Sequence, residues 1–114
     1  MKMDAKIVYG KDVPLTSLGG GVSRRVLAYT EQLMIVEVVC EQGGVGSVHT
    51  HPHWQNTYIR KGRFRFTIDG AEHEVAEGDS IAFPPDIPHG MVCLEAGALL
   101  DIFTPMRKDF VPEN

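Results

Sequence analysis

The chain has 114 residues and a mass of 12.6 kDa, which fits one domain with its own hydrophobic core. Its net charge of −4 argues against nucleic-acid binding and attachment to anionic membranes, because such proteins are usually basic. It lacks the roughly 20-residue apolar run of a membrane helix. Residues 1–10 also lack the apolar stretch of a signal peptide. We therefore expect a soluble cytoplasmic protein, with a single domain over residues 1–114 and neither nucleic acid nor membrane as a partner.

The first half of the chain predicts short strands separated by turns. Leu33–Cys40 is an apolar run, and the glycines of residues 43–46 interrupt the chain after it. Thr57–Arg60 is a second strand, closed by the dipeptide Lys61-Gly62. Arg63–Asp69 alternates strictly, so it is a strand that turns Phe64, Phe66 and Ile68 to one face.

The second half continues the same pattern. Asp69-Gly70 predicts a tight hairpin, because a type I′ turn needs residues that tolerate positive φ. Pro84–Pro88 cannot be a central strand, since proline donates no ladder hydrogen bond. The strands predicted around these two turns are Glu72–Val75, Ser80–Phe83, Met91–Leu94 and Ala98–Thr104.

Many short strands at regular spacing, without a helical period, predict an all-β sandwich or small barrel. The two cysteines, Cys40 and Cys93, each lie in an apolar run, which predicts buried reduced thiols. Residues 60–66 carry basic side chains interleaved with Phe64 and Phe66, but the alternation puts the two kinds on opposite faces. This favours a solvated face or a subunit contact over an RNA-binding sheet.

Histidine spacing gives the strongest indication of chemistry. His49 and His51 are two residues apart at a predicted strand end, so both imidazoles point to one face and can reach one metal ion. Gln55 offers an amide oxygen four residues later. His89 directly follows the rigid Pro84–Pro88 turn, which fixes the direction of the chain. These residues predict a divalent-metal site.

Three further aromatic side chains, His53, Trp54 and His73, have less defined roles. His53 shares the parity of His49 and His51, and we expect it to support the metal ligands or to line the substrate pocket. Trp54 is a pocket wall or a packed residue at the rim. His73 alternates with two glutamates after the hairpin and is expected to be exposed.

Two segments resemble the two motifs of the cupin superfamily: His49-Thr50-His51-Pro52-His53-Trp54-Gln55, and the stretch from Gly78 through the prolines to His89. The resemblance implies a single-domain double-stranded β-helix, or jelly-roll barrel. It also implies one divalent transition-metal ion per chain (Zn, Ni, Fe, Mn or Cu), held by His49, His51, Gln55 and His89. Gln55 stands where many cupins have Glu.

A narrower resemblance covers Gly19–Leu27 and Leu100–Phe110, which are similar to pectin-degradation cupins of the KdgF type. That family converts cyclic 4,5-unsaturated uronates into their open-chain keto form. The resemblance implies active-site roles for Asp101, Phe103 and Arg107. In this interpretation Asp101 moves a proton, Arg107 binds the carboxylate of the substrate, and Phe103 packs against the sugar ring.

The ligand chemistry is compatible with an anionic sugar substrate. Three neutral imidazoles and one amide leave a divalent ion its full +2 charge, which favours an anionic ligand. An iron-dependent oxygenase and a non-catalytic sugar-binding module are the alternatives. We also expect a homodimer, because small barrels have open edge strands and the apolar segment Ile7-Val8-Tyr9 could add to one.

Overall fold

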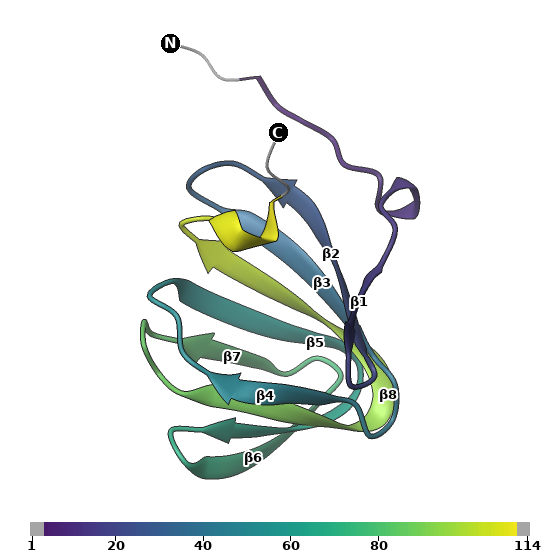
Figure 1. Ribbon diagram of the computed structural model, residues 1–114, viewed down its shortest axis with the longest axis vertical. Coiled ribbons are helices and arrows are strands. Elements are labelled where there is room, and N and C mark those ends of the chain that lie inside the picture. The colour runs from purple at the N-terminus through teal and green to yellow at the C-terminus, as the bar shows by residue number, and fades with distance from the viewer. Residues whose placement is uncertain (1–3, 112–114) are drawn as a thin grey trace.

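The computed structural model describes residues 4–111, and this part of the chain is almost entirely β-structure (Figure 1). The first and last three residues of the predicted domain lie outside the described residues. No helix among the described residues is long and apolar enough to cross a membrane. The elements are η1 (Gly10–Asp12), β1 (Thr16–Gly19), β2 (Val22–Tyr29), β3 (Met34–Cys40), β4 (Val45–His49), β5 (Trp54–Ile68), β6 (Ala71–Ala76), β7 (Ser80–Phe83), β8 (His89–Thr104) and η2 (Lys108–Phe110).

The two long strands, β5 and β8, hold the barrel together. They pair antiparallel along most of their length, and each bends so that its two halves belong to opposite walls (Figure 1). On one wall the order is β1-β2-β3-β8-β5, with β7 added beside β5. On the other wall, β4 pairs with the first half of β8 and β6 with the second half of β5. The all-β jelly-roll barrel is therefore confirmed.

The sequence predicted two short strands in place of each long one: Thr57–Arg60 and Arg63–Asp69 for β5, and Met91–Leu94 and Ala98–Thr104 for β8. The predicted breaks lie where β5 and β8 cross. The register of the β5–β8 ladder shifts at Lys61 and again at Arg63. Gly62 has φ +87°, and a Cβ on Gly97 would lie 2.0 Å from the Lys61 carbonyl oxygen. The glycines thus mark a bulge at which the backbones approach closely and bend, whereas the sequence pattern suggested chain breaks.

The bulge also changes which residues of β5 face the barrel interior. Before it, the buried residues are Gln55, Thr57 and Ile59; after it, they are Phe64 and Phe66. The phenylalanines join the core, as predicted, and Cys40 and Cys93 are buried free thiols. The Asp69-Gly70 turn has positive φ at both residues, as the hairpin requires.

Two strands, β1 and β2, lie where the sequence predicted none, and β4 extends the strand end predicted at His49 back into the predicted flexible break. β2 carries Ser23, Arg24 and Arg25 in succession, which hides its apolar alternation, and β4 contains Gly46 within the predicted flexible break. Both strands are held by long-range pairing, β2 with β3 and β4 with β8, which local sequence patterns do not reveal.

A charged cluster on the outer wall fixes the chain that leads into the barrel. Glu37 on β3 is only 4% exposed and is paired with Arg25 and Arg60. Arg25 also donates hydrogen bonds to the carbonyls of Gly10 and Val13. This network anchors the segment around η1 to the sheet, while residues 4–9 run outward in an exposed path.

Candidate functional site

Three of the four predicted metal ligands converge at one end of the barrel. His49 ends β4, His51 lies in the short connection to β5, and His89 begins β8. One ring nitrogen from each lies within 4.8 Å of one from each of the others. His51 and His89 are buried, whereas His49 is exposed.

Backbone carbonyl groups orient all three imidazoles in the same way. The Nδ1 atoms lie 2.9 Å from the Ser47 carbonyl oxygen for His49, 3.2 Å from that of His53 for His51, and 2.9 Å from that of Ile87 for His89. A carbonyl oxygen can only accept, so Nδ1 carries the hydrogen in His49 and His89, and their Nε2 atoms keep the lone pair that binds a metal ion. His51 faces an acceptor at both ring nitrogens, the His53 carbonyl oxygen at Nδ1 and Gln55 Oε1 at Nε2.

Gln55 supplies the test of whether a cation fits this group. Its Nε2 donates to the Thr57 hydroxyl at 2.9 Å and to Asp101 Oδ1 at 3.0 Å, which orients the amide. Its Oε1 is then directed at His51 Nε2, 2.8 Å away. His51 Nε2 can donate its hydrogen to this oxygen, and a divalent ion can replace that hydrogen with both atoms as ligands. Three imidazole nitrogens and one amide oxygen are a donor set that fits a divalent metal ion.

The surroundings of His51 and His89 favour their neutral forms. Burial lowers the pKa of His51 and of His89, and the neighbouring imidazoles and Arg107 lower both further. A neutral imidazole is a ligand, whereas an imidazolium is not.

Local structure explains why His89 arrives at this place. Phe83 ends β7 and its ring stacks on His89, with the centroids 4.5 Å apart. Between them the proline-rich turn donates a hydrogen bond from the Asp86 amide to the His51 carbonyl, at 2.9 Å. A Cβ on Gly90 would lie 2.8 Å from the Gly46 carbonyl oxygen, so glycine allows β8 to approach β4 closely here.

Asp101 lies beside the metal-ligand group on the inner face of β8. The β5–β8 register places Thr57 opposite Asp101, and the Thr57 hydroxyl donates to Asp101 Oδ1 at 2.7 Å. Gln55 donates to the same oxygen. Burial raises the pKa of Asp101 to about 6, and these two hydrogen bonds oppose the shift. The carboxyl group is thus fixed through one oxygen, with Oδ2 left for a ligand.

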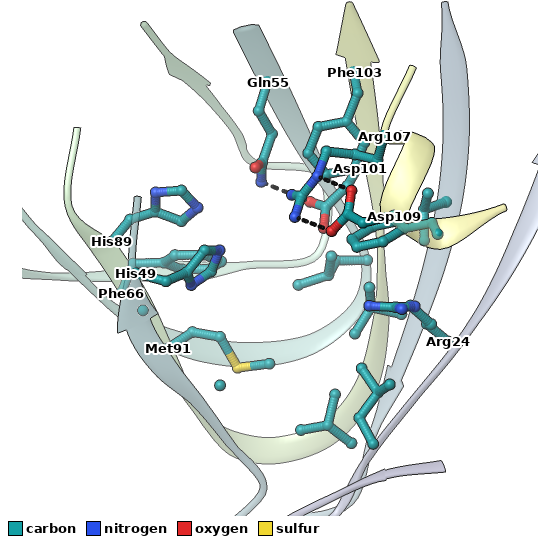
Figure 2. Close-up of a pocket in the computed structure, with 18 residues that line it drawn as sticks. Arg24, His49, Gln55, Phe66, His89, Met91, Asp101, Phe103, Arg107 and Asp109 are labelled. Atoms are coloured by element: carbon teal, nitrogen blue, oxygen red, sulfur yellow. Dashed lines mark hydrogen bonds and ion pairs between the residues drawn. The ribbon is translucent and has the colours of Figure 1, made fainter. Parts of the chain in front are cut away.

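His49, Gln55, His89 and Asp101 line one cavity of about 370 Å³ inside the barrel. In Figure 2, His49 and His89 lie on one side, Gln55 and Asp101 point inward above, and Arg24 lies on the opposite side. Apolar side chains of the core form much of the remaining wall. The volume is at the lower end of the range for small-molecule sites.

The chain after β8 closes over part of the cavity. The Arg107 guanidinium forms a two-pronged ion pair with Asp109, with Nε–Oδ1 and Nη2–Oδ2 distances of 3.1 and 2.9 Å. It also lies 4.2 Å from the ring centroid of Phe110 and 5.2 Å from that of Phe103. Asp101, Phe103 and Arg107, assigned from the family resemblance, thus share the cavity with the histidines.

His53 and Trp54 lie at the edge of this arrangement. The carbonyl of His53 orients His51, and its half-buried ring packs edge-on against His51 and Phe103, 5.5 and 6.2 Å between centroids. His53 Nδ1 is buried without a hydrogen-bond partner among the described residues. Trp54 is 57% exposed, and His73 is exposed as predicted.

Sequence reasoning missed two residues of the cavity region, Thr57 and Arg24. Thr57 shares the parity of Gln55 and could have been found once both were placed on one strand. Arg24 lies between Val22 and Val26, and that parity would have placed it inside the barrel if the strand had been recognised.

Known proteins resemble this chain in both sequence and structure. Residues 36–103 match the cupin domain family. The pectin degradation protein KdgF of Dickeya dadantii (strain 3937) is 34% identical over 102 residues, which cover 88% of this chain and 93% of that protein. The structure of KdgF from Halomonas sp. superposes with a TM-score of 0.90 at 29% identity, covering 95% of this chain and all of that one. An RmlC-like cupin from Shewanella frigidimarina NCIMB 400 gives a TM-score of 0.89 at 36% identity, covering 97% and 100%.

Proposed function

This chain belongs to the cupin family, and we propose that it opens the ring of a cyclic 4,5-unsaturated uronate and converts the product to its keto form. The observation that carries the proposal is the partly buried Asp101 carboxyl group, held through one oxygen beside three convergent imidazoles. The similarity to pectin degradation proteins over nearly the whole chain supports the choice of an acidic sugar.

The proposed reaction is an isomerisation, so protons and atoms balance without a co-reactant. Asp101 accepts the proton of the anomeric hydroxyl while the bond between the anomeric carbon and the ring oxygen breaks. The products of this step are an aldehyde at carbon 1 and an enolate at carbon 5, and Asp101 returns its proton to carbon 4, which completes the ketone. A carboxyl group with one free oxygen can serve in both directions.

The other residues of the cavity bind and orient the sugar. His49, His51, Gln55 and His89 would hold a divalent ion, which when bound supplies Lewis-acid stabilisation to the anomeric oxygens. Thr57 and Gln55 keep the Asp101 carboxyl in place. Phe103 offers an apolar surface to the sugar ring, and Arg107 adds positive charge that favours an acid. His53 supports His51 through its carbonyl group.

The experiment that tests the proposal uses unsaturated monouronate made by a pectate or alginate lyase. The metal-loaded protein should speed the loss of the ring double-bond absorbance above the rate without protein, and a chelator should remove the acceleration. The reaction should proceed equally without oxygen, which separates it from an oxygenase. A rate equal to the protein-free control would overturn the proposal.

The proposal also covers the location, the oligomeric state and the partners of the protein. We expect a cytoplasmic homodimer that takes a small anionic sugar and neither nucleic acid nor a membrane surface as its partner. The supporting observations are the acidic net charge and the exposed apolar residues of the N-terminal segment.

A further inference from the structure

Arg24 is a charged residue on the inner face of a wall strand. On β2 it lies between Val22 and Val26, which contact the core, and opposite Val38 of β3. It lines the same cavity as the histidines. A guanidinium group placed among apolar neighbours is costly unless it meets a partner. Asp109 lines the same cavity and its charge favours the guanidinium, but both of its oxygens are bonded to Arg107, which leaves room for a further anion at Arg24.

The structure leaves the donor edge of Arg24 available. Phe110 covers one face of the guanidinium, with the Cζ atom 3.7 Å from the ring centroid. Within residues 4–111, no side chain or carbonyl accepts a hydrogen bond from Arg24, and it has no ion pair. Arg107 differs, because its Nε and Nη2 are already bonded to Asp109. Of the two arginines that line the cavity, Arg24 is the one whose guanidinium N–H groups have no hydrogen-bond acceptor among the described residues.

We propose that Arg24 is the carboxylate-binding residue of this cavity, an inference that rests on the proposed action on an acidic sugar. Arg24 faces His49 and His89 from the opposite side of the cavity, and Asp101 lies between these two sides (Figure 2). A uronate also has its reacting anomeric end and its carboxylate at different parts of the ring. With the anomeric oxygens at the histidines, the carboxylate extends toward Arg24.

This arrangement selects acids over neutral sugars. The planar fork matches a carboxylate with two parallel N–H···O bonds, and stacking on Phe110 keeps the fork in one orientation. A neutral sugar leaves the guanidinium without its partner, so it binds less well. Arg107, held by Asp109, also packs against the Phe110 ring, 4.2 Å from its centroid.

Binding of stable sugars tests the inference without turnover. D-galacturonate and D-galactose are titrated by calorimetry into the metal-loaded protein, its Arg24→Gln and Arg24→Lys variants, and an Arg65→Gln control whose side chain is exposed on β5. We expect Arg24→Gln to weaken galacturonate binding about ten- to one-hundredfold and to leave galactose unchanged. Arg24→Lys, which keeps the charge and loses the fork, should be intermediate, and Arg65→Gln should match the wild type.

Two results would overturn the inference: wild-type protein that binds galacturonate no better than galactose, or an Arg24→Gln variant with wild-type affinity for galacturonate. Circular dichroism confirms that each variant is folded. The uronate assay, run in parallel, separates this inference from the proposed reaction. If the protein turns over the unsaturated uronate and Arg24→Gln has the wild-type KM, the subsite is refuted but the reaction is not. If galacturonate binding depends on Arg24 but the wild-type protein does not turn over the unsaturated uronate, the reaction is refuted but the subsite is not.

Discussion

At the scale of single residues, the two carboxyl oxygens of Asp101 differ in their hydrogen bonds. Oδ1 accepts hydrogen bonds from Thr57 and Gln55, and Oδ2 accepts none from the described residues. Gln55 contacts both the carboxyl group and the metal-ligand group, so it fixes their relative position. In the proposed reaction, this one amide side chain links the proton carrier to the metal-ligand group.

Asp101→Asn should lower kcat about 100- to 10,000-fold, because an amide of the same shape cannot carry the proton. Metal content, measured by elemental analysis, should stay at the wild-type level. Asp69→Asn serves as the control, since Asp69 is an exposed turn residue with positive φ that asparagine tolerates. Wild-type turnover of unsaturated galacturonate by Asp101→Asn would show that this carboxyl group is not the proton carrier.

His51→Ala should reduce the metal content well below one ion per chain and abolish metal-dependent turnover, while the circular dichroism spectrum stays that of a β-protein. The barrel has an apolar core of its own, so it does not need the ion to fold. The matched control is His73→Ala, which removes an exposed histidine. Equal metal loading of both variants would argue against the assigned ligands.

At the scale of elements, the bends in β5 and β8 bring the site together. His89 and Asp101 come from the two halves of β8, and Gln55 comes from the first half of β5. Only a strand that passes from one wall to the other can contribute residues to both sides of the cavity. The close backbone approach at Gly62 and Gly97 is therefore a condition for the site as well as for the fold.

Gly97→Ala should destabilise the barrel by about 3 kcal/mol or more, because the new Cβ would overlap the Lys61 carbonyl group and backbone must move to relieve it. Urea unfolding measures the loss. Gly10→Ala is the control, since its Cβ would meet only a Leu27 methyl group at 3.9 Å. A Gly97→Ala variant as stable as this control would mean that the two backbones separate at no cost.

The Glu37 cluster should make stability sensitive to acid. Burial alone would raise the pKa of Glu37, but hydrogen bonds from Arg60 and Arg25 outweigh it and hold the pKa below its ordinary value. A lowered pKa in the folded state contributes stability above the unfolded value of about 4.3. That contribution disappears as the pH falls through the folded value.

Glu37→Gln should therefore cost roughly 2–4 kcal/mol at pH 7 and lose less stability than the wild type between pH 5 and about 3, because it lacks this carboxylate. The free energy of unfolding measured across this window provides the comparison. Parallel pH profiles for the two proteins would show that Glu37 contributes nothing to acid sensitivity.

At the scale of the whole molecule, open strand edges remain among the described residues. Four strands each pair with a single neighbour: β1, β4, β6 and β7. Ile7 is 75% exposed in a segment that pairs with none of the described strands. Such edges and apolar residues favour association with a second copy.

Sedimentation at micromolar concentration should give about twice the 12.6 kDa of one chain. Val8→Lys should shift the protein toward the monomer without altering its β-spectrum, since Val8 lies in the exposed segment. Val48→Lys, which changes an exposed valine elsewhere, should leave the dimer intact. A monomeric wild type would refute the dimer, and a dimeric Val8→Lys would exclude the segment as its added strand.

Local sequence patterns predicted much of the fold but not the features that depend on long-range strand pairing. Alternation found Phe64 and Phe66 in the core, and the two histidine motifs identified residues that the structure brings together. The bulge at Lys61-Gly62 was invisible because it reverses the inward parity of β5, which follows from crossing β8 rather than from local preference. Arg24 was missed for a related reason: β2 is held in place by its pairing with β3.

The central place of β8 has a consequence for synthesis on the ribosome. β3, β4 and β5 all pair with β8, yet its first residue, His89, is translated after all of them. Until then these strands have unpaired edges and no closed core, a condition in which nascent chains aggregate or recruit chaperones. Because His89, Asp101 and Phe103 arrive with this strand, barrel closure and completion of the site coincide late in translation.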